Sequence, residues 1–331
     1  SLSSIEGAFA PTGYAYFYYD AQTPMYSPRY ARVTQSGSTP VALLPAGATT
    51  LTFDTSGTLL FYALGSYPAG YKLYVLSLAD GQARELSIVQ DGEVFDGFEI
   101  VPAPGNSVIV EIRKLADDQT FLRRVSLDAN QAGTTITNPA VSAAYIFGSD
   151  DPNLLLVTNS DNSLDFIRLE PYARSTLPGT FEFSVDPNTY GIVGHHAYYL
   201  ANDVLHLVQY DDAGALQDIA ISAAGEKAVP CTGRFTYTPQ QKLAFVQGDG
   251  AELVFVDLTT SPPAAVGSFS SSATGYKVGC PHWGDSDTAL LFGETNGTNG
   301  NTYITRWNAA APEQPKLITQ AIGGVLAFMY R

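Results

Sequence analysis

The sequence has few of the residues from which metal centres and disulfide frameworks are built. Its 331 residues include only two cysteines, two methionines, two tryptophans and four histidines. Two cysteines cannot form a disulfide framework in a chain of this length, and their spacing is not that of a zinc site. A catalytic zinc needs three protein ligands, and the histidines form no set that we can assign to a metal. The sequence therefore predicts no metal and no cofactor. The histidines are His195, His196, His206 and His282.

Positive charge is also scarce. Seventeen Lys and Arg face 32 Asp and Glu, for a formal net charge of −15. Such a surface repels phosphate backbones, which excludes nucleic acid as the expected partner. No run of 18 apolar residues occurs, so we predict no transmembrane segment. The start, SLSSIEGAFAP, has neither a basic nor an apolar leader region. It is compatible with a cytosolic start lacking Met, with a processed mature end, or with the tether of a lipid-anchored precursor.

What the chain does contain is a repeat. Related segments begin at an aromatic or aliphatic anchor residue and follow one another at intervals of 44 to 48 residues. A period near 45 residues, with several short strands in each unit, is the signature of a β-propeller. The anchors are Phe9, Phe53, Val101, Phe147, Ile192, Tyr237 and Trp283.

The second repeat shows how one unit becomes four antiparallel strands. Residues 49–53 are a short apolar strand, and Asp54-Thr55-Ser56-Gly57 is a run of turn formers. Two alternating strands, 58–63 and 71–78, follow. After an Asp-Gly turn at 80–81, residues 84–88 form a more polar outer strand.

Seven such blades are predicted, within a single propeller domain over residues 1–331. Six or eight blades remain as alternatives if the weak unit near Ile192 is misread. We expect the last blade to be mixed, with one C-terminal strand, 324–330, beside three N-terminal strands, 13–19, 29–34 and 40–44. Such closure would leave no exposed sheet edge. The other first strands are expected at 49–53, 95–101, 141–147, 189–193, 231–237 and 276–283.

The repeat resembles a known family. The segment TFDTSGTLLFYALGSYPAGYKLYVLSLADGQARELS is similar to the TolB-type repeat of the wider WD40-like propeller superfamily, and GRFTYTPQQKLAFVQGDGAELVFVDL looks like a degenerate copy. The resemblance implies the propeller fold. It does not carry over the role of TolB, because that protein has an additional N-terminal α/β domain before its propeller.

The two cysteines bear on the compartment. Cys231 lies six residues before the anchor Tyr237, and Cys280 lies three before the anchor Trp283. If both lie on the first strands of adjacent blades, a disulfide is geometrically feasible and indicates an oxidising compartment. The alternative is a pair of buried thiols in a cytosolic protein. We predict the disulfide and an extracytoplasmic location, in the periplasm, at the cell surface or secreted.

Catalytic signatures are weak. The chain has no G-x-S-x-G nucleophile elbow and no α/β-hydrolase segment, so we assign no catalytic residue. His282, at the end of a predicted first strand, is a candidate for the mouth of the central channel. It is the residue on which a lactonase- or lyase-like enzyme, the alternative function, would depend.

Aromatic loop residues suggest binding instead. Tyr26, Tyr67 and Tyr71 fall in or beside Pro- and Gly-containing loops between second and third strands. Rigid aromatic rings lose little entropy on binding a protein or a sugar. The sequence therefore predicts an exported, non-catalytic propeller that binds protein partners as a scaffold of the cell envelope or surface. A carbohydrate-binding lectin is the second alternative, although repeated aromatic pockets are not visible.

Overall fold

The computed structural model describes most of the chain as β-strands and turns, and the part it describes contains no helix. Within this part, no helix is long and apolar enough to cross a membrane. The described residues are 5–10, 13–19, 28–34, 37–45, 47–54, 56–66, 68–97, 100–128, 133–137, 143–148, 151–177, 189–231, 241–283, 289–306 and 312–322.

The chain divides into two compact units. Unit 1 comprises residues 1–146 and 157–161, and unit 2 comprises residues 147–156 and 162–331. The division passes through strands β14 and β15. The prediction of a single domain over residues 1–331 stays a prediction.

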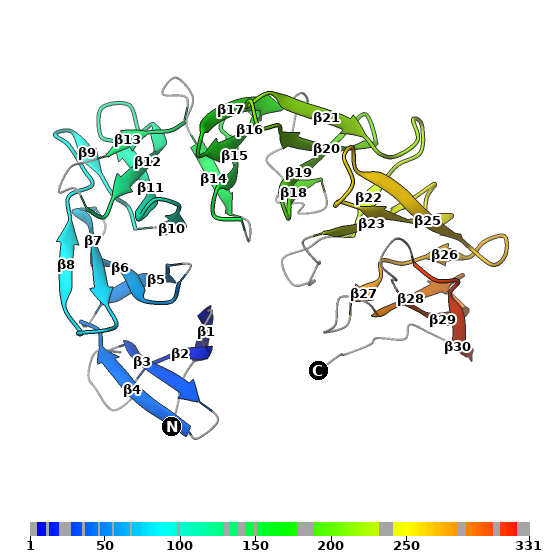
Figure 1. Ribbon diagram of the computed structural model, residues 1–331, viewed down its shortest axis with the longest axis horizontal. Coiled ribbons are helices and arrows are strands. Elements are labelled where there is room, and N and C mark those ends of the chain that lie inside the picture. Colours follow the sequence, from blue (N-terminus) through cyan, green and yellow to red (C-terminus); the bar gives the residue numbers. More distant parts are fainter. Residues whose placement is uncertain are drawn as a thin grey trace. The chain divides into compact units, whose positions relative to one another are not determined.

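Strands β1 to β13 belong to unit 1 and form three antiparallel sheets, each made of strands consecutive in the chain (Figure 1). They are β1 (Ile5–Ala10), β2 (Gly13–Tyr19), β3 (Pro28–Thr34) and β4 (Gly37–Leu43); β5 (Ala48–Phe53), β6 (Leu59–Ser66), β7 (Gly70–Ser77) and β8 (Ala83–Leu86); and β9 (Glu93–Val94), β10 (Ile100–Ala103), β11 (Ser107–Lys114), β12 (Thr120–Ser126) and β13 (Thr134–Thr135).

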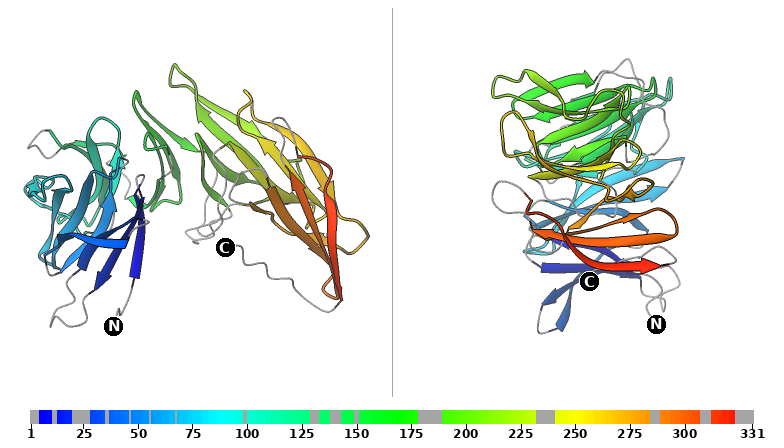
Figure 2. Two further views of the ribbon diagram at one scale, coloured as in Figure 1. Left: turned by 60° about the horizontal axis from the view of Figure 1, so that its bottom comes forward. Right: turned by 90° about the vertical axis from the view of Figure 1, so that its right-hand side faces the viewer.

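Four further antiparallel sheets follow along the chain (Figures 1 and 2); in the first three, consecutive strands pair, and in the last, β26 and β27 both pair with β28. They are β14 (Ala143–Gly148), β15 (Leu154–Asn159), β16 (Leu164–Leu169) and β17 (Tyr172–Leu177); β18 (Tyr190–Val193), β19 (His196–Ala201), β20 (Val204–Tyr210) and β21 (Leu216–Ala220); β22 (Val229–Pro230), β23 (Lys242–Gln247), β24 (Glu252–Asp257) and β25 (Ala264–Ser270); and β26 (Lys277–Val278), β27 (His282–Trp283), β28 (Ala289–Thr295), β29 (Asn299–Arg306) and β30 (Lys316–Ile322).

The sheet β5–β8 confirms the four-strand interpretation of the repeat. Its first turn forms because the Asp54 carboxylate accepts hydrogen bonds from the backbone N–H groups of Thr58 and Leu59, both at 2.8 Å. Gly57 takes a φ of 67° there, which glycine adopts without steric cost. The all-β class and the propeller-type sheets are thus confirmed, whereas a closed ring of seven blades stays a prediction.

The mixed closing blade is not what the first sheet shows. The strand that pairs with β2 is β1, with Phe9 opposite Tyr14, so all four strands of this sheet come from the N-terminal segment. The reason lies in the repeat itself, because Phe9 is an anchor like Phe53, and a first strand precedes each anchor. The expected C-terminal strand, 324–330, lies outside the described residues.

Two first strands are interrupted where one continuous strand was expected. The segment 95–101 is replaced by β9 and β10, separated around Gly97, whose φ is 77°. The segment 276–283 is split into β26 and β27, which pair with the two ends of β28. Pro281 lies in the second gap and has no N–H to donate to a ladder, so the strand breaks there.

Apolar side chains fill the space between consecutive sheets of a unit. In unit 1, Phe61 and Leu73 of one sheet pack with Phe95, Val110 and Phe121 of the next, and all five are buried. Central strands therefore carry apolar residues on both faces, which explains the continuous burial of β15 and β16. In unit 2, three further clusters do the same.

A buried carboxylate ties the strands of the last sheet to the loop before it. Glu294 on β28 is 2 % exposed and accepts hydrogen bonds from the Ser272 backbone N–H at 2.8 Å, from Asn301 Nδ2 at 2.7 Å and from the Tyr303 hydroxyl at 2.8 Å. Burial by itself would raise the pKa of this carboxyl. The hydrogen bonds, from Ser272 and Asn301 first, lower it below its ordinary value.

The predicted disulfide is confirmed. Cys231, directly after β22, is bonded to Cys280, which lies between β26 and β27, with a Cα–Cα distance of 5.3 Å. Cys231 is 3 % exposed and packs in the core between these two sheets. Cys280 lies at the surface. The bond is compatible with an extracytoplasmic protein.

Candidate functional site

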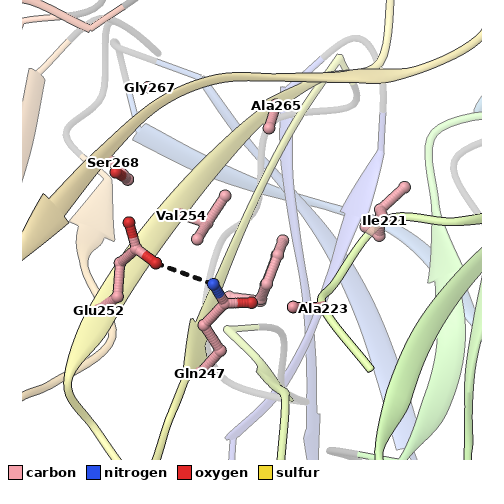
Figure 3. A pocket seen from close by; sticks show the side chains of 9 residues that line it. Ile221, Ala223, Gln247, Glu252, Val254, Ala265, Gly267 and Ser268 are labelled. Carbon is pink, nitrogen blue, oxygen red and sulfur yellow. Dashed lines mark hydrogen bonds between the residues drawn. The ribbon is translucent and has the colours of Figure 1, made fainter. Parts of the chain in front are cut away.

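Unit 2 contains a pocket on one face of the sheet β22–β25. Strands β23 and β24 pair so that Gln247 lies opposite Glu252 and Phe245 opposite Val254. Alternate side chains of a strand share a face, which places these four side chains on the same side of the sheet. The pocket has a volume of ≈ 350 Å³. It is lined by Ile221, Ala223, Phe245, Gln247, Glu252, Val254, Ala265, Gly267 and Ser268 (Figure 3).

The floor of the pocket is apolar. Phe245 is 1 % exposed and Val254 is 6 % exposed, so both rest in the core and only line the base. Ile221, from the segment after β21, forms the wall across from Val254 (Figure 3). The mouth is formed by the exposed residues Ala265 and Ser268 of β25. An aliphatic chain therefore finds a complementary surface in this pocket.

One end of the pocket is polar. The turn after β23 closes with a hydrogen bond from the Ala251 N–H to the Gly248 carbonyl and brings Gln247 next to Glu252. Gln247 Nε2 donates to Glu252 Oε2 at 2.8 Å (Figure 3). Gln247 is only 9 % exposed, and its Oε1 has no hydrogen-bond partner among the described residues. A buried acceptor without a partner costs about 1–3 kcal/mol of stability, and this oxygen has almost no accessible surface, so a ligand in the pocket does not reach it as the side chain stands.

The surroundings of the polar end are acidic. The carboxylate of Glu226 comes within 3.6 Å of the position that a Cβ on Gly248 would occupy. Asp249 is also near, but its carboxylate is paired with Lys277 Nζ at 2.5 Å. The pairing with Lys277, and to a smaller extent the charge of Lys227, lowers the pKa of Asp249. Glu226 and Glu252 are thus the acids of this region without a described cation partner.

The adjacent histidines have contrasting environments. His195 lies in the turn before β19, exposed, with Nδ1 2.7 Å from Asp151 Oδ2. His196 is 4 % exposed, and neither ring nitrogen has a hydrogen-bond partner among the described residues. Burial, with a smaller contribution from the charge of His195, lowers the pKa of His196 to about 4. His196 is therefore a neutral core residue at pH 7.

His206 belongs to a small polar cluster on β19, β20 and β21. Its Nδ1 lies 2.8 Å from Asp218 Oδ1, and the Tyr199 hydroxyl donates to the other oxygen of Asp218 at 2.5 Å. The imidazole stacks on the Tyr199 ring with centroids 4.8 Å apart. Burial, and then the hydrogen bond to Asp218, raise the pKa of Tyr199. A histidine oriented by a carboxylate is the arrangement that general bases use, but the described contacts of His206 include no nucleophile.

Of the residues singled out from the sequence, none that the structure describes lines this pocket. Tyr26 and Tyr67 fall outside the described residues. Tyr71, at the start of β7, is half-buried against the unit 1 core, and its ring covers Gly97. His282 is exposed on β27, next to the buried Trp283. The role of the three tyrosines in binding and that of His282 at a channel mouth remain predictions.

Sequence reasoning missed Gln247 and Glu252. The signal was present in KLAFVQGDGAELVFVD, because a short turn between two alternating strands places the residues that flank it on one face. What the pattern could not reveal is that Ile221 and Ala223 stand opposite them. Among the described residues, no group of three His, Cys, Asp or Glu side chains is gathered so that it could hold a metal ion.

Comparison with known proteins supports the fold alone. No family model matches the chain, and no curated protein does. Among solved structures, a prolyl endopeptidase aligns over 96 % of this chain with 14 % identity and a TM-score of 0.51. The dihydro-heme d1 dehydrogenase NirN aligns over 96 % of this chain and 67 % of its own, at 11 % identity and a TM-score of 0.49. Hsv2 from Kluyveromyces lactis aligns over 96 % of this chain and 99 % of its own, at 13 % identity and a TM-score of 0.43.

The chain spans 50 % of the length of the prolyl endopeptidase chain. At 14 % identity the likeness concerns the architecture alone, because one fold can host unrelated functions. The class of protein is thus a propeller-type, all-β protein. The TolB-type resemblance stays a prediction.

Proposed function

We propose that this propeller works by binding rather than by catalysis, as a protein-binding or scaffold component of the cell envelope or cell surface. The observation that carries the proposal is the pocket on the sheet β22–β25, whose apolar floor has the side chains of Gln247 and Glu252 at one end (Figure 3). The Cys231–Cys280 disulfide supports the extracytoplasmic location.

The net charge of −15 bears on the kind of partner. An acidic protein associates fastest with a partner that presents a basic surface, and this attraction weakens as salt is added. We therefore expect a basic protein partner. Tyr26 and Tyr67, together with Tyr71 at the start of β7, remain the second proposed contact, for which aromatic residues close to Pro and Gly are the support.

The test begins with a tagged, oxidised full chain incubated with native envelope and culture fractions. A protein recovered at one-to-one stoichiometry is then purified and titrated by isothermal calorimetry. Saturable binding that weakens between low and high salt is the expected result. The proposal fails if no purified candidate binds saturably at any salt concentration, or if binding is unaffected by salt.

A catalytic role is the second candidate, and the His206–Asp218 pair is the observation that favours it. A lactonase- or lyase-like activity would use Nε2 of His206 as a base, with Nδ1 oriented by Asp218. Screening the protein against lactones and uronate oligosaccharides tests this, with His206→Gln as the variant and His282→Gln as the control. Turnover lost only in His206→Gln would establish catalysis, whereas turnover lost only in His282→Gln would favour the channel residue predicted from the sequence.

A further inference from the structure

We propose that Asn296, at the end of the hairpin that joins β28 to β29, is the acceptor of an N-linked glycan. Asn296-Gly297-Thr298 has the N-x-T pattern of such acceptors, with a residue other than proline in the middle. No other asparagine of the chain is followed two residues later by Ser or Thr. The inference goes beyond the proposed function and shares with it only the extracytoplasmic location, which the Cys231–Cys280 disulfide supports.

The end of this hairpin is open to solvent. Thr295, Asn296, Gly297 and Thr298 are all exposed. Gly297 has a φ of +85°, and a Cβ placed on it would have no atom within 4 Å apart from its own chain neighbours. The space around the hairpin end is therefore free of other parts of the described fold. A bulky group on Asn296 is compatible with the folded sheet β26–β30.

Hydrogen bonds hold the Asn296 side chain by its oxygen and leave its nitrogen available. Oδ1 accepts from the backbone N–H groups of Thr298 at 3.0 Å and of Asn299 at 2.8 Å. Nδ2, the atom to which the glycan is attached, has no hydrogen-bond partner among the described residues. The Thr298 hydroxyl, which completes the acceptor pattern, makes no hydrogen bond within the described part of the chain either. Both groups that define the pattern are thus accessible to an enzyme.

Other asparagines have their amide nitrogens engaged. Asn301, on the same hairpin, donates through Nδ2 to the buried carboxylate of Glu294 at 2.7 Å. Tyr303 stands where an acceptor pattern starting at Asn301 would need Ser or Thr. In unit 1, Asn106 Nδ2 donates to an Asp128 carboxylate oxygen at 2.7 Å. The acceptor pattern and an available amide nitrogen coincide at Asn296.

The reaction needs a lipid pyrophosphate-linked oligosaccharide as co-substrate and an oligosaccharyltransferase as enzyme. Asn296 Nδ2 forms a bond to the anomeric carbon of the first sugar, while the bond from that carbon to the pyrophosphate oxygen breaks. The lipid pyrophosphate leaves with the bonding electrons, and one amide proton passes to a base of the transferase. No oxidant or reductant takes part. The product is a bulky, solubilising glycan on the protein surface.

The first test is peptide mapping by mass spectrometry of the full chain purified from native envelope and culture fractions. We expect peptides that contain Asn296 to carry a glycan. Peptide N-glycosidase in isotopically labelled water should release the glycan and leave a labelled Asp at this position. An incubation without the enzyme controls for spontaneous deamidation of the Asn-Gly pair. A native chain whose Asn296 peptides are all unmodified, or labelled equally without the enzyme, overturns the inference.

Variants secreted from a host that has an oligosaccharyltransferase test the pattern. Asn296→Gln removes the acceptor, and Thr298→Val replaces the hydroxyl by a methyl group of similar size, so we expect either change to abolish the mass increase seen in the wild type. Asn299→Gln is the matched control, because Asn299 lies in the same hairpin outside the pattern, and it should keep the full increase. A wild type without a glycan, a glycan retained in Asn296→Gln, or one lost in Asn299→Gln overturns the assignment. Each of these outcomes leaves the proposed function standing, because no residue of the pocket lies in this hairpin.

Discussion

Breaking the Cys231–Cys280 disulfide should strongly destabilise unit 2. The bond closes a loop between residues 49 apart in the sequence and joins the sheet β22–β25 to the sheet β26–β30. In the chain-entropy account, a cross-link that closes a loop of about 50 residues removes enough unfolded-state freedom to stabilise the folded state by about 4 kcal/mol at 25 °C. Both sheets lie in unit 2, so the loss should appear there and leave unit 1 largely unchanged.

The measurement is urea unfolding of the oxidised and the reduced wild-type chain, followed by tryptophan fluorescence. Trp283 and Trp307 are the only tryptophans and both belong to unit 2. With an m value of about 2–3 kcal/mol/M, a loss of about 4 kcal/mol lowers the midpoint by about 1–2 M urea. Because Cys280 lies at the surface, the bond is accessible to a reductant without prior unfolding.

The Cys231→Ala/Cys280→Ala double variant is the control for side-chain volume. Cys231 is 3 % exposed, so its truncation adds a small packing loss of about 1 kcal/mol on top of the loss of the bond. We therefore expect the urea midpoint of the variant to lie slightly below that of the reduced wild type. Coincident unfolding curves for oxidised and reduced protein would refute the reasoning, because the loop would then be constrained by other contacts in the unfolded state.

Three further changes test other parts of the fold. His196 has a pKa of about 4 when folded against about 6.5 when unfolded, so the unfolded chain binds the proton first as the pH falls. The free energy of unfolding should therefore decrease by about 3 kcal/mol from pH 6.5 to 4. Urea titrations at several pH values should show that His196→Leu flattens this dependence. Glu294→Gln places an NH2 group where the carboxylate accepts hydrogen bonds from surrounding donors and should cost about 2–4 kcal/mol of stability. A loss of unfolding free energy below about 1 kcal/mol in urea would contradict the buried network. Gly70→Ala places a Cβ 2.4 Å from Val94 Cγ2 at a φ of +90° and should cost more than about 2 kcal/mol of stability. Gly81→Ala, at a φ of +71° with no atom within 4 Å of the new Cβ, should cost about 1 kcal/mol. The reverse order of the two variants in thermal unfolding would refute the steric argument.

The local parts of the fold follow from local patterns. The run Asp54-Thr55-Ser56-Gly57 and the alternation on both sides of it predict strands that agree with β5 to β8 within a few residues. Turn residues and the period of two act over a few positions, so a single repeat contains all the information that its sheet needs. The pairing of Cys231 with Cys280 follows similarly, because residues at related places in consecutive repeats lie on neighbouring sheets.

The parts of the fold that depend on distant segments were harder to predict from the sequence. The first strand β1 was missed because 324–330 offered an equally apolar partner for β2, and strand pairing between distant segments is not encoded in either segment alone. The breaks at Gly97 and Pro281 were missed although local signals were present, because Gly97 follows Asp96 in a turn-forming pair and Pro281 has no N–H to donate. The sequence does not determine which of the adjacent residues His195 and His196 is buried, and only the neighbouring strands decide that it is His196.

The amino-acid sequence by itself determined the repeat, the antiparallel strands, the propeller-type class and the disulfide, because each depends on spacing along the chain. The tertiary structure alone decided the pocket. Gln247 and Glu252 become neighbours through one turn, but the wall formed by Ile221 comes from the segment that follows β21. Whether an acceptor such as Gln247 Oε1 is buried without a partner depends on every group packed around it. No pattern within one strand contains that information.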